Sequence, residues 1–299
     1  MTQRIIKRLL CLVCLCGCCL GVVSAQEDMT KRAYVLFDNT GKEITYGELV
    51  KQLSGYDIVF LGEIHNCPIT HWLEFEITRS MYAIHKDKLM LGAEMLESDN
   101  QLILDEYMQR QISYDRFEAE ARLWDNYNTD YYPVVFFAKE HDIPFVATNI
   151  PRRYANSVKN KGIEVLDSLS DEAKRYIAPL PVPFEYNEKE SEAAFSMMNM
   201  LGGKQSGDNR KLAQAQAVKD ATMGWFIAHN MKDKFLHING SYHSDFKGGI
   251  IPYLLRYRPG TKVVTVTSVR QESIHQLDEE NKDRADFYIC VPEDMVNSY

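Results

Sequence analysis

Short apolar runs that end in ligand-forming polar residues are the feature of this chain that most constrains its fold. The runs cover residues 57–61, 89–93, 144–148 and 235–238. The polar residues that follow them are Glu63 and His65, then Glu94, then Asn149, and finally His243. Such continuous runs are typical of strands buried on both faces of a parallel sheet. Ligands bind at the carboxyl ends of such strands, so we predict that the four ends share one pocket.

The remaining pattern alternates strands with helices, which predicts an α/β fold with a mainly parallel central sheet flanked by helices. A hairpin over 34–44 precedes a helix that Thr45 caps and that ends near Leu53. A longer helix is expected over 68–85, with an apolar stripe of Ile69, Trp72, Leu73, Ile77, Met81 and Ile84. Further strands are expected at 262–267 and 286–291, and a helix near 250–257.

Two stretches, about 98–140 and 150–230, are mainly helical and predict an inserted helical subdomain. The first is rich in aromatic residues, and helices are expected over 101–111, 114–124 and 132–139. The second carries prolines at 179, 181 and 183, a helix over 188–200, a glycine-rich break at 202–207, and a long helix over 208–229.

Residues 1–25 have the pattern of an export signal, which leaves 26–299 as one α/β domain. Arg4, Lys7 and Arg8 precede an apolar stretch, and small residues at 23–25 suit signal-peptidase cleavage. Two alternatives stay open: a lipobox at 15–18 that would acylate Cys18, and an uncleaved anchor. We expect export to the periplasm or outer membrane, with membrane attachment only through a lipid anchor.

Charge and cysteine usage exclude several classes of protein. Without residues 1–25, 31 basic residues stand against 42 acidic ones, so the chain is a poor nucleic-acid binder. Of seven cysteines, five lie in 1–25, so Cys67 and Cys290 are expected as free buried thiols, unless the fold lets them pair. The chain contains no Walker loop, G-x-G-x-x-G, G-x-S-x-G or H-E-x-x-H motif, which disfavours nucleotide-dependent enzymes and the usual serine esterases.

The polar strand ends suit either metal binding or acid–base chemistry. Glu63 and His65 are two residues apart, so an extended backbone would point both to one side. A carboxylate with an imidazole can hold a transition metal or form an acid–base pair, although an ion pair or helix cap is the simpler reading. Glu94 needs a partner because an unpaired buried carboxylate is costly, whereas Glu97 is expected in solvent. His71 either points back to this mouth or is half-exposed, and His237 is expected to be a satisfied core histidine.

The segment 124–133 is unusually aromatic, and it contains Tyr127, Tyr131 and Tyr132. These rings could form a flat apolar wall for a planar cofactor, and a phenolate can ligate ferric haem iron. The simpler alternative is that they close the helical block against the sheet.

These motifs together resemble the ChaN-like haem-binding uptake family, within the Tiki, TraB and erythromycin-esterase-like superfamily. The resemblance is carried by the following segments, in this order: Leu61 to His65 with His71, Gly92 to Met95, Trp124 with Tyr127 to Pro133, Asn149 to Arg152, Gln214 to Met223, and Asn239 to His243. It covers about 57–267.

The resemblance implies an exported or lipid-anchored haem-binding protein that serves haem or iron acquisition. It implies that a tyrosine ligates the iron, with Tyr127, Tyr131 and Tyr132 as candidates, and that a histidine such as His71 meets a propionate. Asn149 and Arg152 are further candidates for haem contacts. A homodimer around a cofacial haem pair is expected, with outer-membrane uptake machinery as a partner.

The alternative function is a metal-dependent hydrolase of the Tiki type. In that reading Glu63, His65, Glu94 and His243 are catalytic, and Glu63, His65 and His243 bind a divalent metal ion that activates water.

Overall fold

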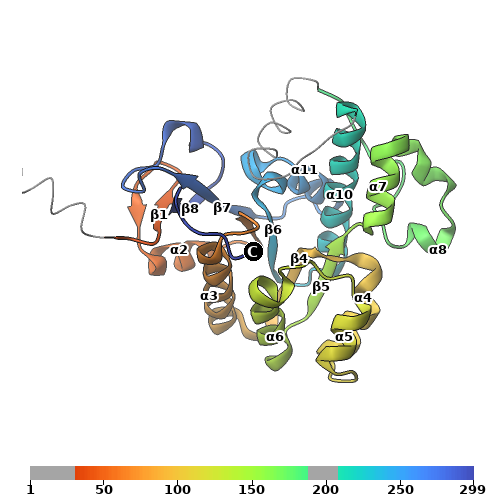
Figure 1. Cartoon of the computed structure of the whole chain (residues 1–299), viewed down its shortest axis with the longest axis horizontal. Helices are drawn as coiled ribbons and strands as arrows, with labels where there is room; N and C mark the ends of the chain where they lie inside the picture. The colour runs from red at the N-terminus through yellow and green to blue at the C-terminus, as the bar shows by residue number, and fades with distance from the viewer. Residues whose placement is uncertain (1–30, 188–207) are drawn as a thin grey trace, which may run out of the picture. The chain divides into compact units, whose positions relative to one another are not determined.

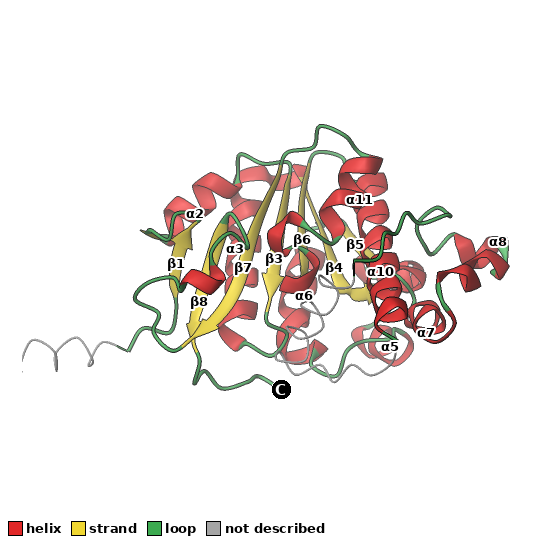
Figure 2. Ribbon diagram, turned by 90° about the horizontal axis from the view of Figure 1, so that it is seen from above, coloured by secondary structure: helices red, strands yellow, loops and turns green. Residues whose placement is uncertain are grey.

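A single sheet runs through the protein, in the strand order β2-β1-β8-β7-β3-β6-β4-β5 (Figures 1 and 2). The structure is a computed structural model that describes residues 31–187 and 208–299. Its strands are β1 (Val35–Asp38), β2 (Glu43–Ile44), β3 (Ile58–Glu63), β4 (Leu89–Glu97), β5 (Phe145–Asn149), β6 (Lys234–Gly240), β7 (Val263–Gln271) and β8 (Phe287–Pro292). The strands from β8 to β5 pair in parallel, whereas β1 pairs antiparallel with both β2 and β8. The predicted mainly parallel α/β sheet is therefore confirmed.

Helices cover both faces of the sheet, as the continuous apolar strands predict (Figure 2). Val59 and Leu61 of β3 belong to the core shared with the helix α3 (Pro68–His85). Ile58 and Phe60 point the other way, into the core shared with α10 (Asn209–Asn230) and α11 (Ile250–Tyr257). We call these the α3 face and the α10 face of the sheet.

The first helices begin and end as the sequence predicts. Thr45 and Glu48 form a capping box at the start of α2 (Tyr46–Leu53), and Pro68 occupies the first turn of α3. The expected stripe of α3 is wrong in part, because Trp72 and Ile84 are about half exposed, at 49% and 51%. Thr70, His71 and Glu74 are buried on this helix instead. The buried face of α3 thus carries polar groups.

The first helical stretch is divided into short pieces, whereas the second ends in α10, a 22-residue helix close to the predicted 208–229. The first contains α4 (Gln101–Met108), α5 (Tyr114–Glu120), a π-helical turn η3 (Tyr127–Tyr131) and α6 (Tyr132–Glu140). The second contains α7 (Arg152–Lys161), the 3₁₀ helix η4 (Ile163–Ser168), α8 (Asp171–Lys174) and α10. The expected helix over 188–200 and the break at 202–207 lie outside the described residues. Helix α10 packs directly on the sheet and on α7, and residues 34–299 form one compact unit.

Strand β4 runs further than expected. The sequence predicts its end at Glu94, but the strand continues to Glu97, and its pairing to β5 is interrupted between Ala93 and Glu97. The expectation that Glu97 lies in solvent is wrong. The residue is 5% exposed and accepts a hydrogen bond from Arg122 at 2.9 Å. The ion pair supplies the partner that a buried carboxylate requires.

Cys67 and Cys290 are buried free thiols, as expected. Burial raises the pKa of the Cys290 thiol to about 12. Among the helices of the described residues, none has the length and apolar character needed to cross a membrane.

Candidate functional site

The predicted strand ends meet at the carboxyl-terminal end of the parallel strands, where β6 lies between β3 and β4. Glu63 is the last residue of β3 and is in register with Gly240, the last residue of β6. Glu94 lies where the pairing of β4 is interrupted, and His243 follows in the 3₁₀ turn η5 (Ser241–His243). Glu63 contacts residues of α3, whereas Glu94 reaches α10 through His243. The two glutamates therefore serve separate clusters on opposite faces of the sheet.

The first group, which we call the α3-side cluster, consists of Glu63, His65, His71, Glu74 and Asp130. His65 Nδ1 lies 2.5 Å from Glu63 Oε1. His71 Nδ1 lies 3.4 Å from Glu63 Oε2 and 3.3 Å from Glu74 Oε2. On the other side of the ring, His71 Nε2 lies 3.3 Å from Asp130 Oδ2. The helix brings His71 and Glu74 together because residues three apart share one face.

Residues around the π-helical turn η3 hold this cluster in place. The Tyr131 hydroxyl donates to Glu63 Oε1 at 2.7 Å. Asn126 Nδ2 donates to Asp130 Oδ2 at 2.7 Å and to the His65 carbonyl at 3.1 Å. Ser298, near the end of the chain, donates from its hydroxyl to the same Asp130 oxygen at 2.8 Å. Segments far apart in the sequence therefore fix the cluster.

The electrostatics of the α3-side cluster are those of crowded carboxylates around one imidazole. Burial opposes the charged form of Glu63, but the neighbouring His65 and His71 outweigh it and lower its pKa to about 2. Burial and the Glu63 charge raise the pKa of Glu74 to about 8. Against the effect of burial, Glu63 and Glu74 raise the pKa of His71 to about 11. Glu74 therefore keeps a proton that an isolated glutamate would lose at neutral pH.

The second group, the α10-side cluster, consists of Glu94, Asp220 and His243, all buried. His243 Nδ1 lies 2.5 Å from Asp220 Oδ1 of α10, and its Nε2 lies 3.2 Å from Glu94 Oε1. The backbone amide of Gly240 donates to Glu94 Oε2 at 2.8 Å. Despite burial, the charges of Glu94 and Asp220 raise the pKa of His243 to about 10, so an imidazolium bridges the two carboxylates.

His65 and Gly240 lie between the two clusters. A methyl group placed on Gly240 would come within 2.7 Å of His65 Nε2 and 3.5 Å of Glu94 Oε2, so only glycine leaves room for the ring. The His65 side chain is 43% exposed, in contrast to the other cluster residues, and packs edge-on against Trp124 at 5.0 Å between ring centroids. His65 is therefore the cluster residue that solvent reaches.

The other residues predicted from the sequence take different positions. Asn149 Nδ2 donates to the Glu94 carbonyl at 2.9 Å, so it braces the strand end. Arg152 is exposed at the start of α7. His237 is fully buried and bonded to Thr148 and Asn239, as expected for a core histidine.

The predicted tyrosines are mainly core residues. Tyr127 and Tyr131 are buried at 2% and 4% exposure, and Tyr132 is half-buried among Tyr114, Tyr127 and Phe136. His71 is buried at 5% and points back to the strand ends, so the half-exposed alternative is wrong.

Sequence reasoning missed Glu74, Asn126, Asp130 and Asp220. Glu74 could have been found, because it lies in line with Thr70 and Ile77 on the buried face of α3. Asp220 similarly follows the apolar Ala217 and Val218 on α10. An acidic residue inside a buried helical stripe needs a partner and is a signal of a site. Asn126 and Asp130 carry no such signal, because a π-helical turn positions them.

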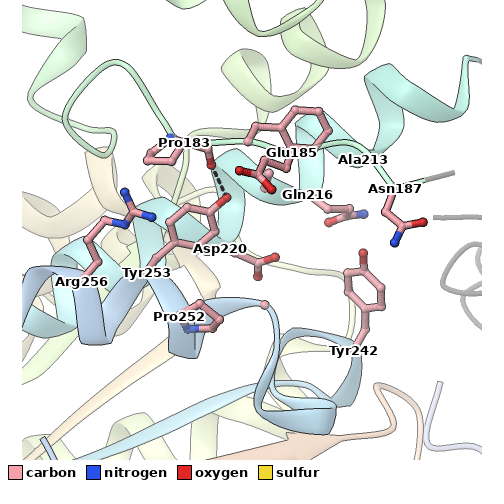
Figure 3. A pocket seen from close by; sticks show the side chains of 13 residues that line it. Pro183, Glu185, Asn187, Ala213, Gln216, Asp220, Tyr242, Pro252, Tyr253 and Arg256 are labelled. Atoms are coloured by element: carbon pink, nitrogen blue, oxygen red, sulfur yellow. Dashed lines mark hydrogen bonds between the residues drawn. The ribbon is translucent and has the colours of Figure 1, made fainter. Parts of the chain in front are cut away.

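A cavity of about 630 Å³ lies beside the α10-side cluster (Figure 3). Its lining includes Phe184, Asp220, Tyr242, Tyr253 and Arg256. Figure 3 shows the Tyr242 ring projecting into the cavity, whereas the Tyr253 hydroxyl donates to the carbonyl of Pro183, another lining residue, at 2.8 Å. This volume is within the range of small-molecule sites, about 300–1,000 Å³.

Several solved structures are similar to this chain, and the first of those described here supports its fold. ChaN of Campylobacter jejuni, in a structure of cofacial haem binding, matches with a TM-score of 0.66 and 19% identity, covering 86% of this chain and 96% of that chain. An erythromycin esterase mutant, EreC in its open conformation, gives a TM-score of 0.44 and 13% identity, covering 87% and 83%. The type III effector HopBA1 gives 0.44 and 10%, covering 83% and 92%.

Sequence comparisons identify the family. A search of curated proteins gives no match. The profile of the family described as haem-binding uptake, Tiki superfamily, ChaN matches residues 49–254. This match spans more than half of the sequence and includes both clusters and most of the cavity lining. The chain therefore belongs to the ChaN family of haem-binding uptake proteins in the Tiki superfamily.

Proposed function

We propose that this protein is an exported haem-binding protein that serves haem or iron acquisition. The observation that carries the proposal is the family match over residues 49–254. Haem would be the cargo, held through a tyrosine oxygen on its iron and through cationic or imidazole groups on its propionates.

A tyrosine can ligate haem iron only if the haem reaches its hydroxyl. Tyr127 and Tyr131 are buried, and the Tyr131 hydroxyl is engaged by Glu63, so neither fits without rearrangement of the core. Tyr132 is half-buried beside Phe136, which is 41% exposed, so it is the accessible member of the predicted set. Tyr242 fits better, because its ring projects into a cavity large enough for a planar ligand (Figure 3).

The cavity also supplies groups that suit the rest of a haem. Phe184, Pro252 and Tyr253 offer apolar surface, and Arg256 is a cation that a propionate could pair with. We therefore propose Tyr242 as the axial ligand and Arg256 as a propionate contact, in place of Arg152.

Hemin titration of the purified protein tests this proposal. We expect a shifted Soret band that Tyr242→Phe removes and Arg256→Gln weakens. Tyr253→Phe is the matched control, because it lines the same cavity with its hydroxyl already engaged. If the Soret shift is lost in Tyr132→Phe but kept in Tyr242→Phe, the haem site is at Tyr132 and not in the cavity. No Soret shift in the unmodified protein would refute haem binding altogether.

We further propose export and haem-linked dimerisation. Export is supported by the basic start, apolar stretch and small residues within 1–25, with acylation of Cys18 as the alternative processing. The mass of the mature N-terminus tests both. Two protomers would enclose a cofacial haem pair and interact with outer-membrane uptake machinery. Dimerisation predicts a molar mass by light scattering that doubles when hemin is added.

A metal-dependent hydrolase is the second candidate. It is favoured by half-exposed His65 lying beside both Glu63 and Glu94, where a water could be activated. Metal-dependent ester or peptide hydrolysis that disappears in His65→Ala would support it, and activity unchanged by chelation would exclude it.

A further inference from the structure

The protonation of the His71 ring can be read from its neighbours. Nε2 faces the His65 carbonyl at 3.1 Å, and a carbonyl can only accept a hydrogen bond, so Nε2 carries a hydrogen. Nδ1 faces two carboxylate oxygens, one of Glu63 and one of Glu74, at 3.4 and 3.3 Å. In a neutral ring this Nδ1 is a buried lone pair that faces the carboxyl groups of Glu63 and Glu74.

Two carboxylate oxygens of this cluster lack hydrogen-bond partners. Within residues 31–187 and 208–299, neither Glu63 Oε2 nor Glu74 Oε1 has a hydrogen-bond partner, although both residues are only 1% exposed. An unsatisfied buried carboxylate oxygen is costly. Glu63 Oε1 is by contrast fully engaged by Tyr131 and His65, which leaves Oε2 free to face His71.

His71 Nδ1 is within hydrogen-bond distance of Glu74 Oε2 at 3.3 Å, but both of its carboxylate contacts are long, and their lengths fit a shared cation better. Charge-assisted N–H···O bonds are usually about 2.7–2.9 Å long, clearly shorter than the contacts of His71 Nδ1. Ligand atoms arranged tetrahedrally at about 2.1 Å from a metal lie about 3.4 Å apart. One atom each from Glu63, His71 and Glu74 lies within 4.8 Å of the others, so one cation can reach all three.

We propose that Glu63, His71 and Glu74 bind one divalent transition-metal cation. One imidazole and two carboxylates form a donor set suited to Zn²⁺, Mn²⁺, Fe²⁺ or Co²⁺. The three residues provide one nitrogen and two oxygen ligands, and a fourth position would be left to a further oxygen or water. This set shares only Glu63 with the metal ligands predicted from the sequence, and it is independent of haem.

Asp130 contacts the other nitrogen of the His71 ring, Nε2, on the side away from Glu63 and Glu74. Metal-binding histidines usually donate their second ring N–H to a carboxylate or a backbone carbonyl, which fixes the tautomer. His71 Nε2 has both, with Asp130 Oδ2 at 3.3 Å and the His65 carbonyl at 3.1 Å. Asp130 is in turn held by Asn126 and Ser298. Asp130 is therefore a positioning residue whose role is to present Nδ1 to the cation.

Metal binding by haem-free protein tests the proposal. The full chain is stripped with a chelator, dialysed, and titrated with Co²⁺ in the visible spectrum and with Zn²⁺ against a chromogenic chelator. We expect one cation per chain. Glu74→Gln should abolish stoichiometric binding, and Asp130→Asn should weaken it by about 10–100-fold. Glu76→Gln is the matched control, since Glu76 is on the same helix but pairs with Arg79 at 3.0 Å.

Two further measurements locate the cation. Glu94→Gln should leave binding unchanged, because Glu94 belongs to the α10-side cluster. Pulsed electron paramagnetic resonance of the Mn²⁺-loaded, unsubstituted protein should show one imidazole nitrogen, a result that does not depend on a variant folding. The proposal is overturned by no stoichiometric cation, by two imidazole nitrogens, or by binding that Glu94→Gln removes and Glu74→Gln keeps. Haem binding can succeed or fail independently of each result.

Discussion

The two clusters are built from the same residue types on opposite faces of one sheet, yet their hydrogen bonding differs. On the α10 side, His243 bonds to Glu94 and Asp220, and Gly240 satisfies the second Glu94 oxygen. On the α3 side, one oxygen of Glu63 has two donors, whereas the other has no hydrogen-bond partner among the described residues. A buried carboxylate is therefore structural where donors match acceptors, and a candidate cation ligand where they do not.

The largest expected effect comes from disrupting the α10-side cluster, in which the hydrogen-bonding groups are matched. His243→Ala removes the cation between Glu94 and Asp220 and leaves two buried carboxylates facing each other. We expect the free energy of unfolding at neutral pH to fall by about 3–5 kcal/mol, as for other broken buried pairs. Urea unfolding measures it, with the exposed His275→Ala as control. If the free energy of unfolding falls by less than about 1 kcal/mol, His243 does not stabilise Glu94 and Asp220 as a buried ion pair would.

The pH dependence of the same cluster follows from the His243 pKa. Because this pKa is raised from 6.5 to about 10 in the folded protein, the folded state holds a proton that the unfolded state loses. The stabilisation is complete below about pH 6.5 and is lost as pH rises towards 10. We expect the stability difference between the unsubstituted protein and His243→Gln to shrink over that range, as urea unfolding at successive pH values would show. A constant difference would contradict the raised pKa.

A smaller effect comes from two neighbouring tyrosines on the α3 side. Tyr131→Phe deletes a hydrogen bond to the Glu63 carboxylate and should cost about 1.5–3 kcal/mol in chelated protein. Tyr127→Phe deletes a buried hydroxyl that has no partner within the described chain, so it should cost nothing or stabilise slightly. Thermal or urea unfolding compares the pair directly. Equal costs would show that the hydroxyl of Tyr131 contributes only packing.

The smallest effect measures the independence of the two clusters. Glu63 and Glu94 lie on opposite faces of the sheet. The changes in the free energy of unfolding caused by Glu63→Gln and Glu94→Gln should therefore add to within about 0.5 kcal/mol. The double variant completes the cycle. A larger interaction energy would show that His65, which lies between them, couples the clusters electrostatically.

Much of the sheet could be predicted, because strands buried on both faces leave long apolar runs. The same property hides which face a polar residue points to: Met90 and Leu91 are equally apolar but belong to opposite faces. The sequence thus indicated that Glu63, Glu94, Asn149 and His243 gather at one edge, but not that the edge divides into two clusters. Glu74 was missed although its place on the buried face of α3 is visible in the sequence. Asp220 was missed because its partner, His243, lies 23 residues further along the chain. The deep burial of Tyr127 and Tyr131 depends on a π-helical turn that no local pattern predicts.

The place of β6 in the sheet has a consequence for how the chain acquires its structure. This strand, residues 234–240, fills the gap between β3 and β4, which are separated from it by some of the longest intervals in the sequence. Until β6 is made and inserts, β3 and β4 lack the strand that joins them, and Glu94 lacks its partners Gly240 and His243. Such late, non-local pairing slows folding. A newly made chain would therefore stay unfolded for longer than a chain whose paired strands are neighbours in the sequence.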